Sequence, residues 1–350
     1  MDHFIGQIEI ENFRCFDSLN VENLKRVNLI GGDNNVGKSA FLEALEIVAK
    51  TTDPSSLIIA LADSINRRQS YNAQFSEFDL INYENNTLKI KTNTISISFA
   101  IGLIKPTDQP SPLDTLPSSG EKSEFDNLSV ILTVNKDSQV ASYIRFSNII
   151  NGLEKLFLRH KVKNTDFIPV TSLDERKLSA IYGSIVDMGM TEDINVFLRN
   201  FDSRIDSLVI RPTEESSIFK IKLRDRKVPV LLSSMGGGLN RYIAIVCAIW
   251  KSKDGQLFID EVENGIHYTK YEKLWEIIFN TSKEANCQVF AATHSKEFIE
   301  AFSRVAERYD HENIKFTNLS RTVDNADKIV ATVLDSVGLE EHFRLGMDVR

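Results

Sequence analysis

A glycine-rich run near the start of the chain has the spacing G-x-x-x-x-G-K-S, which is that of a phosphate-binding loop. Backbone N–H groups and a helix N-terminus hold phosphate oxygens there, the lysine neutralises the β- and γ-phosphates, and the serine hydroxyl is a ligand of Mg²⁺. We therefore predict a site for a nucleoside triphosphate with its magnesium ion. The residues expected at this site are Gly32, Asp33, Asn34, Asn35, Val36, Gly37, Lys38, Ser39 and Ala40.

Two adjacent carboxylates follow an apolar stretch late in the chain, where Leu257–Ile259 leads into Asp260 and Glu261. Apolar strands often end in acidic residues, so the pair alone is a weak signal. Together with an upstream phosphate loop it is typical of a hydrolytic site. We expect Asp260 to share the magnesium ion with Ser39, and Glu261 to act as the general base that polarises the attacking water.

A histidine follows the next apolar stretch, in Thr293-His294-Ser295. His294 is predicted to hydrogen-bond the γ-phosphate or the attacking water and so to report its presence. Ser295 is expected to cap the helix that carries Phe298. The two roles are compatible, because capping accounts for the serine and not for the histidine.

A second anion-binding helix start is predicted where two serines and three glycines open an apolar helix, in the run SSMGGGLNR at 233–241. The nucleotide contacts expected from it are Ser234, Gly236 and Gly238. One nucleotide cannot easily occupy two separate helix starts of one subunit. We therefore expect this loop to cover the γ-phosphate bound by another subunit. The alternative is a flexible loop before a helix, which the stretch taken alone would favour.

The elements that must position these residues show an α/β rhythm at both ends of the chain. Two strands are predicted within residues 6–30, and further strands at 256–259 and 287–292. Apolar spacing predicts helices after Ser39, at 239–250 and at 269–285. The pattern indicates a P-loop NTPase whose doubly wound, mostly parallel sheet takes strands from both ends of the chain.

The middle of the chain, 51–230, is predicted to be an inserted lobe of helices and strands within a single domain that spans 1–350. Partial alternation predicts an added antiparallel β-sheet from strands within 87–104 and 128–147. Residues 174–204 are expected to be helical, and 207–232 to form two more strands. Proline, serine and aspartate concentrate in 105–127, which is predicted to be a mobile surface loop.

The order of the motifs resembles that of ABC-type ATPase heads: phosphate loop, serine-glycine signature, Asp-Glu pair and switch histidine. The runs IEIENFRCF and GGDNNVGKSAFLEAL are similar to the RecF and SMC-like branch. The runs SMGGGLNR, IDEVENGIH and AATHS resemble the OLD-like AAA ATPases, which are often found in bacterial antiviral systems. The resemblance covers 6–50 and about 230–300. It implies an ABC-type fold, hydrolysis of ATP with Mg²⁺, and a homodimer or higher oligomer that forms through ATP.

Some residues depart from that pattern. Tyr268 follows His267 where proline is usual, and the glutamine loop has only the candidates Gln69 and Gln74. OLD nucleases carry a Toprim domain after the switch histidine, but 56 residues follow His294 here, and they hold no well-spaced acidic set. We therefore expect any nuclease to be a separate polypeptide.

Two functions fit these observations. The first is an ATP-driven switch that passes its state to a separate effector, such as a nuclease or toxin, in antiviral defence. The alternative is a RecF-like ATPase of DNA repair or chromosome maintenance that clamps DNA. Basic clusters that would serve the clamp lie at Lys155, Arg159, Lys161 and Lys163, and at Arg224, Arg226 and Lys227. The chain lacks sustained heptads, which counts against an SMC-like clamp.

Other classes are disfavoured by composition and spacing. Asn135-Lys136-Asp137 departs from the guanine-reading Asn-Lys-x-Asp by one position, which excludes a small GTPase. A net charge of −8 argues against a protein coated in positive charge that holds nucleic acid non-specifically, and leaves open a local basic groove. No apolar run is long enough to span a membrane, and the start is not typical of a secretion signal. We expect a cytoplasmic protein with buried free thiols, namely Cys15, Cys247 and Cys287.

Overall fold

The computed structural model describes residues 3–69, 77–81, 87–103, 128–142, 164–170, 175–212, 217–309, 311–322, 328–335, 338–339 and 341. The predicted mobile loop at 105–127 therefore lies outside the described residues. Across these ranges, every helix is too short or too polar to span a lipid bilayer.

A six-stranded, mostly parallel sheet organises the chain, with the strand order β15-β14-β3-β13-β12-β8. Its strands are β3 (Val27–Gly31), β8 (Thr165–Ile168), β12 (Gln256–Ile259), β13 (Gln288–Ala292), β14 (Ile314–Arg321) and β15 (Ile329–Leu334). All but the edge strand β15 run parallel. Every residue of β3, β12 and β13 is buried, as in strands that are covered on both faces. Their carboxyl ends meet at one edge of the sheet, which confirms the predicted doubly wound architecture.

An antiparallel sheet with the order β2-β1-β4-β5-β6-β7 forms a second layer. Its strands are β1 (Ile8–Phe13), β2 (Phe16–Val21), β4 (Thr87–Thr92), β5 (Ser96–Leu103), β6 (Leu128–Val134) and β7 (Asp137–Ser142). The prediction of antiparallel strands within 87–104 and 128–147 is confirmed. The two strands predicted within 6–30 are present as β1 and β3, but the count was wrong, because β2 lies between them in sequence and forms a hairpin with β1. β2 was not predicted because half of its residues are polar.

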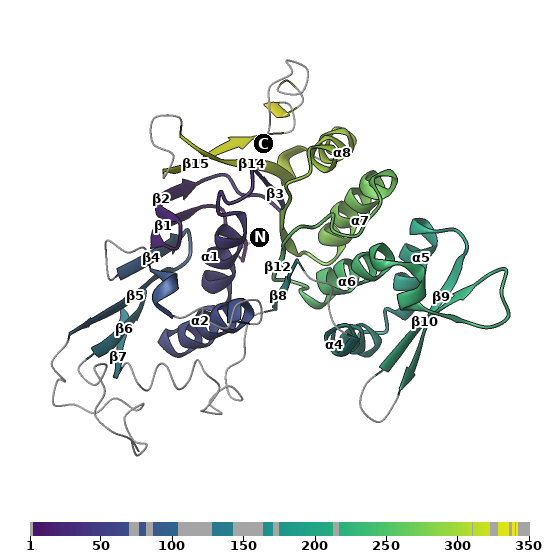
Figure 1. Cartoon of the computed structure of the whole chain (residues 1–350), viewed down its shortest axis with the longest axis horizontal. Helices are drawn as coiled ribbons and strands as arrows, with labels where there is room; N and C mark the ends of the chain where they lie inside the picture. The colour runs from purple at the N-terminus through teal and green to yellow at the C-terminus, as the bar shows by residue number, and fades with distance from the viewer. Residues whose placement is uncertain are drawn as a thin grey trace.

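The helices divide between the two faces of the parallel sheet (Figure 1). On one side lie α1 (Lys38–Lys50) and α2 (Pro54–Gln69) with the antiparallel sheet. On the other lie α4 (Glu175–Asp187), α5 (Thr191–Phe201), α6 (Gly237–Lys251), α7 (Tyr271–Glu284) and α8 (Lys296–Ala306). A three-stranded sheet of β9 (Ile205–Pro212), β10 (Ser217–Leu223) and β11 (Val230–Leu231) accompanies this second group. Short 3-10 turns are η1 (Glu77–Leu80), η4 (Leu232–Met235), η5 (Tyr268–Lys270) and η6 (His311–Asn313).

The two faces of the parallel sheet belong to different hydrophobic cores. Leu29, Ile259 and Ala291 pack into the core that contains α6, α7 and α8. Their neighbours along the strands, such as Ile30 and Phe290, pack into the core that contains α1, α2 and the antiparallel sheet. This alternation follows from the two-residue repeat of a strand.

Buried charges tie α1 to α2 and to the β1–β2 turn. Glu43 pairs with Arg14 and Arg68, and Glu46 pairs with Lys50 and Arg67. Both carboxylates are nearly inaccessible to solvent. Burial by itself raises the pKa of Glu46, but the attraction of its two cationic partners outweighs it and leaves the pKa below its ordinary value. The helix that follows the phosphate loop is thus fixed to α2 by ion pairs as well as by apolar contact.

Candidate active site

The phosphate loop connects β3 to α1 and is shaped by tightly packed neighbours. Gly32 has φ 134°, and a Cβ there would lie 2.3 Å from the carbonyl oxygen of Leu319 on β14. Gly37 has φ 86°, and its Cβ would lie 2.6 Å from the Sγ of Cys15 in the β1–β2 turn. Neither position can hold another residue without displacing the loop. The glycines of the motif are therefore required by local geometry.

Lys38 turns back over the loop that precedes it. Its Nζ donates to the carbonyl oxygens of Gly32 at 2.7 Å and of Asp33 at 2.6 Å. Burial lowers the pKa of the Lys38 ammonium, although the Asp260 carboxylate attracts it. A phosphate group would replace these two neutral acceptors by charged ones, which form stronger hydrogen bonds.

Ser39 and Asp260 meet across the edge of the sheet. Ser39 lies in the first turn of α1, Asp260 directly follows β12, and the serine Oγ donates to the carboxylate Oδ2 at 2.6 Å. Asp260 is 7% exposed, and burial raises its pKa above the ordinary value. A hydroxyl and a carboxylate are hard oxygen donors that suit Mg²⁺. Within the described ranges no three His, Cys, Asp or Glu side chains form a metal cluster. The pair thus fits an ion that takes its other ligands from phosphate and water.

Glu261 occupies a strained backbone position beside that pair. Its φ is 45°, in the left-handed region that glutamate rarely adopts. Arg241, in the second turn of α6, donates from Nη2 to the Glu261 carbonyl oxygen at 3.0 Å, and also to the carbonyl oxygen of Asp260. Its Nη1 donates to the Pro169 carbonyl oxygen beyond β8 at 2.6 Å. Arg241 therefore holds both consecutive carboxylate residues by their backbone.

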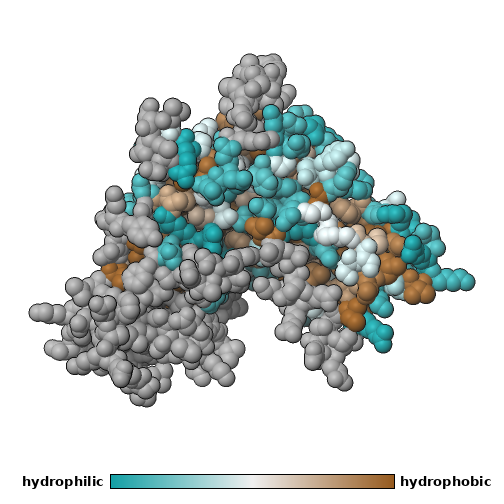
Figure 2. Space-filling model, in the orientation of Figure 1, coloured by the Kyte–Doolittle hydropathy of each residue, from teal (hydrophilic) through white to brown (hydrophobic). Residues whose placement is uncertain are grey.

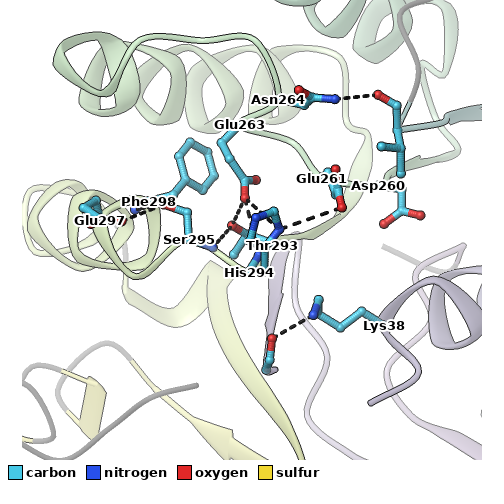
Figure 3. Close-up of polar contacts among 12 residues, drawn as sticks. Lys38, Asp260, Glu261, Glu263, Asn264, Thr293, His294, Ser295, Glu297 and Phe298 are labelled. Carbon is cyan, nitrogen blue, oxygen red and sulfur yellow. Dashed lines mark hydrogen bonds and ion pairs between the residues drawn. The ribbon is translucent and has the colours of Figure 1, made fainter. Parts of the chain in front are cut away.

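His294 lies between two carboxylates at the tip of β13 (Figure 3). Its Nδ1 is 3.8 Å from the Oε1 of Glu261 and 3.6 Å from the Oε1 of Glu263. Ser295 caps α8, since its Oγ accepts from the backbone N–H of Phe298 at 3.2 Å. The cap predicted from the sequence is confirmed.

A cavity of about 810 Å³ extends from the phosphate loop along the strand ends. Its walls combine the loop, the carboxylates after β12, the β1–β2 turn, the end of α2 and the segment through η1. The lining residues are Arg14, Cys15, Asn34, Asn35, Gly37, Lys38, Ser39, Ala40, Arg68, Asp79, Ile81, Asp260 and Glu261. The volume is adequate for a nucleotide. Cys15 is a half-buried wall residue here, whereas the other two thiols are buried as expected.

The serine-glycine signature lies apart from the walls of this cavity. Ser234 is in η4, Gly236 has φ 90°, and α6 begins one residue later. A Cβ on Gly238 would lie 2.5 Å from the carbonyl oxygen of Gly265, so the helix start packs against the loop that follows Glu263. Ser234 and Gly236 are exposed.

The sequence interpretation missed Arg241 and Glu263. Arg241 is 4% exposed in a helix that reads as continuously apolar, and a lone cation there is the signal that was available. Glu263 is one of three acidic residues in four positions after β12. Their partners come from separate segments of the chain, so no local pattern identifies them.

Other candidates from the sequence either lie outside the described residues or belong to elements other than those that form the site. Gln74 and the basic cluster at 155–163 lie outside the described residues, and Gln69 ends α2. The second basic cluster, Arg224, Arg226 and Lys227, is exposed in the turn after β10. The Asn135-Lys136-Asp137 run forms the turn between β6 and β7.

Comparison with known proteins identifies relatives over most of the chain. Residues 27–300 match the family described as "AAA domain, putative AbiEii toxin, Type IV TA system". An "ATP/GTP phosphatase" of Helicobacter pylori is 29% identical over 336 residues, covering 87% of this chain and 89% of the relative. An uncharacterized protein of Methanocaldococcus jannaschii is 24% identical over 209 residues, covering 58% of this chain and 89% of the relative.

Solved structures of SMC heads share the fold. An SMC head bound to the C-winged helix domain of ScpA is 14% identical, covers 95% of this chain and 98% of its own, and gives a TM-score of 0.50. An SMC head from Pyrococcus furiosus with an extended coiled coil, bound to the C-terminal domain of ScpA, is 11% identical, covers 98% of both chains and gives 0.52. The predicted ABC-type fold is confirmed.

Proposed function

The chain belongs to this family of AAA domains, and on that premise we propose that its ATP hydrolysis drives a molecular switch. The enzyme class predicted from the sequence, an ATPase, is confirmed by the family and by the phosphatase relative. The OLD-like branch of these ATPases, suggested by SMGGGLNR, IDEVENGIH and AATHS, is the subtype that we favour.

The observation that carries the proposal is the hydrogen bond from the Ser39 Oγ to the Asp260 Oδ2, which are 2.6 Å apart. Glu261 lines the same cavity at the carboxyl edge of the sheet. In the proposed reaction Lys38 neutralises the β- and γ-phosphates. Ser39 and Asp260 hold Mg²⁺, which would neutralise developing charge on the phosphates. Glu261 accepts a proton from the attacking water, and His294 binds the γ-phosphate.

A second copy of the chain is the proposed partner that completes the site. The exposed signature at Ser234 and Gly236 presents an anion-binding helix start that lies outside the walls of the cavity of its own subunit. Exposed apolar residues border it in sequence: Val228 is 73% exposed and Leu231 is 45% exposed. Figure 2 shows apolar side chains gathered over the region where Figure 1 places β9 and β10. Two-fold symmetry would place each signature over the nucleotide of the other subunit.

Mixing inactive variants tests this arrangement. A mixed dimer of Lys38→Ala and Ser234→Arg keeps one intact composite site, because both defects fall on the other. Random mixing makes about half of the dimers mixed, so about a quarter of wild-type ATPase activity should return. The matched control mixes Lys38→Ala with Glu261→Gln, which leaves no intact site. If mixed oligomers form without recovery in the first mixture, each subunit hydrolyses ATP alone.

We further place the switch upstream of a separate effector, such as a nuclease or toxin, in bacterial antiviral defence. The family description, which names a toxin of type IV toxin–antitoxin systems, supports this reading. Co-expression with the neighbouring reading frames should protect cells from phage, and Lys38→Ala should remove the protection. A complex with DNA that requires ATP and weakens steeply with salt would instead favour the DNA-clamp alternative.

A further inference from the structure

Glu263 lies beneath the tip of β13, two residues after Glu261. The hydroxyl of Thr293 donates to its Oε1 at 2.7 Å, and the backbone N–H of His294 donates to the same oxygen at 3.4 Å (Figure 3). The side chain is 7% exposed, compared with 35% for Glu261. Of the two carboxylates that face His294, Glu263 is therefore the fixed one.

The other oxygen of Glu263 is not satisfied. Its Oε2 is buried and has no hydrogen-bond partner in the described part of the chain. A buried carboxylate oxygen without a partner is destabilising, and burial raises the pKa of Glu263 accordingly. A glutamine or an apolar residue at this position would pack with a smaller loss of folding free energy. The carboxylate thus calls for an explanation in function.

We propose that Glu263 is the positioning residue that orients His294 toward the γ-phosphate. The Nδ1 of His294 faces the carboxylates of Glu263 at 3.6 Å and Glu261 at 3.8 Å, which assigns a proton to Nδ1. The Nε2 atom is then the one left for a phosphate oxygen. A phosphate oxygen only accepts hydrogen bonds, so Nε2 must also carry a hydrogen in that complex. The phosphate and the Glu263 carboxylate would then be the two acceptors of charge-assisted hydrogen bonds from the ring.

This assignment deepens the proposed switch and rests on it. Glu261 must accept a proton during hydrolysis, and so its negative charge is not constant through the reaction. Glu263 lies outside the set that lines the cavity and can hold His294 throughout. Glu261 therefore acts on the attacking water, and Glu263 orients the histidine.

A structural role for Glu263 makes a different prediction. Glu263→Gln keeps a carbonyl oxygen that accepts from Thr293 and from the His294 N–H, and it removes only the charge. If Glu263 merely tied β13 to the loop after β12, this variant would retain full activity. If it positions His294, kcat should fall about 10- to 100-fold while KM for ATP changes less than about twofold.

The experiment compares Glu263→Gln with Glu297→Gln, a nearby carboxylate that accepts from the Ser295 hydroxyl at 3.1 Å. Glu297→Gln should keep wild-type kcat. The melting temperature of Glu263→Gln should equal or exceed that of the wild type, since a buried charge is removed. Thr293→Val, which removes only the hydroxyl donor, should lower kcat by a smaller factor.

A double-mutant cycle with His294→Ala decides the question. If Glu263 acts through the histidine, the double variant should be no slower than His294→Ala alone. Effects that multiply, or a Glu263→Gln variant with wild-type kcat, would overturn the assignment. If the proposed dimeric switch is wrong but Glu263 does position His294, activity will not recover in the mixing experiment, whereas the double-mutant cycle will give the result expected here.

Discussion

Arg241 donates from Nη2 to the backbone carbonyl oxygen of Glu261, with 3.0 Å between the two atoms. The bond joins the second turn of the signature helix to the proposed general base. It acts on a residue whose backbone is strained, at φ 45°. Because a strained conformation persists only when its surroundings fix it, the orientation of Glu261 depends on this guanidinium.

Arg241→Lys should therefore impair hydrolysis more than nucleotide binding. A single ammonium cannot reproduce the fork that reaches Asp260, Glu261 and Pro169. We expect kcat to fall about tenfold, and unfolding free energy to fall by about 1–3 kcal/mol because buried carbonyl groups lose donors. Steady-state kinetics and urea unfolding measure both, with exposed Arg224→Lys as the control. Unchanged kcat in Arg241→Lys would separate the signature helix from catalysis.

Lys38→Ala and Glu261→Gln should separate binding from chemistry. Without the Lys38 ammonium, the phosphate charge is not neutralised, and nucleotide binding should be lost. Glu261→Gln should bind ATP normally but hydrolyse it about 10²–10⁴-fold more slowly, as is typical when a general base is removed. Fluorescent-nucleotide titration and phosphate release report the two steps. Equal turnover of Glu261→Gln and the wild type would exclude the role assigned to Glu261.

Asp260→Asn should raise the stability of the nucleotide-free protein. The folded pKa of Asp260 lies above its ordinary value of 3.8 because of burial. Its contribution to stability is therefore present below that value and is lost as pH rises, so the carboxylate is unfavourable at neutral pH. We expect a gain of about 2–4 °C in melting temperature, corresponding to about 1 kcal/mol. Exposed Asp187→Asn should leave it unchanged.

When ATP and Mg²⁺ are added, the wild type should have a higher melting temperature than Asp260→Asn. The wild type gains stability from a ligand that binds the folded state, whereas Asp260→Asn lacks the carboxylate proposed to hold the ion. Thermal scans with and without MgATP test this directly. A variant that gains as much from MgATP as the wild type would remove Asp260 from the proposed metal site.

The buried ion pairs of α1 should make the protein sensitive to acid. The folded pKa of Glu46 lies below its ordinary value of 4.5, so its contribution is complete above that value and is lost as pH falls through the folded pKa. Glu46→Gln should lower the unfolding free energy by about 3 kcal/mol near pH 7, since Lys50 and Arg67 lose a buried partner. The difference from the wild type should shrink below about pH 4.5. Urea unfolding across this range measures it; a constant difference would contradict the pairing.

The strands of the parallel sheet that could be predicted from the sequence are those buried on both faces, because burial largely determines their residue types. The strand before Gly32, the stretch before Asp260 and the stretch before His294 are mostly apolar, as is typical of strands buried on both faces. Each contains a single polar residue, namely Asn28, Gln256 or Gln288. The strands β2 and β8 were missed because they are short and partly polar. β2 pairs with its neighbour β1 in a hairpin, whereas β8 is defined by pairing with β12, which is distant in sequence.

The site was predictable in its reactive atoms and not in their supports. Lys38, Ser39, Asp260 and Glu261 follow a fixed spacing that chemistry imposes, and the structure brings them to one cavity. The hydrogen bonds of Arg241 and the contacts of Glu263 depend on how three or more segments pack. Contacts of this kind produce no repeating pattern of residue types, so they cannot be predicted from the sequence.

The alternation of side chains along β3, β12 and β13 between two cores has a consequence for motion. A strand shared in this way cannot slide or rotate without opening both cores, so we expect the sheet to be rigid. We expect its amide hydrogens to exchange with solvent only through global unfolding, whereas those of α4, α5 and β9–β11, which belong to one of the two cores only, should exchange through smaller openings. A partner that docks on that side would then act by changing how long those elements stay closed, while the sheet and the phosphate loop keep their shape.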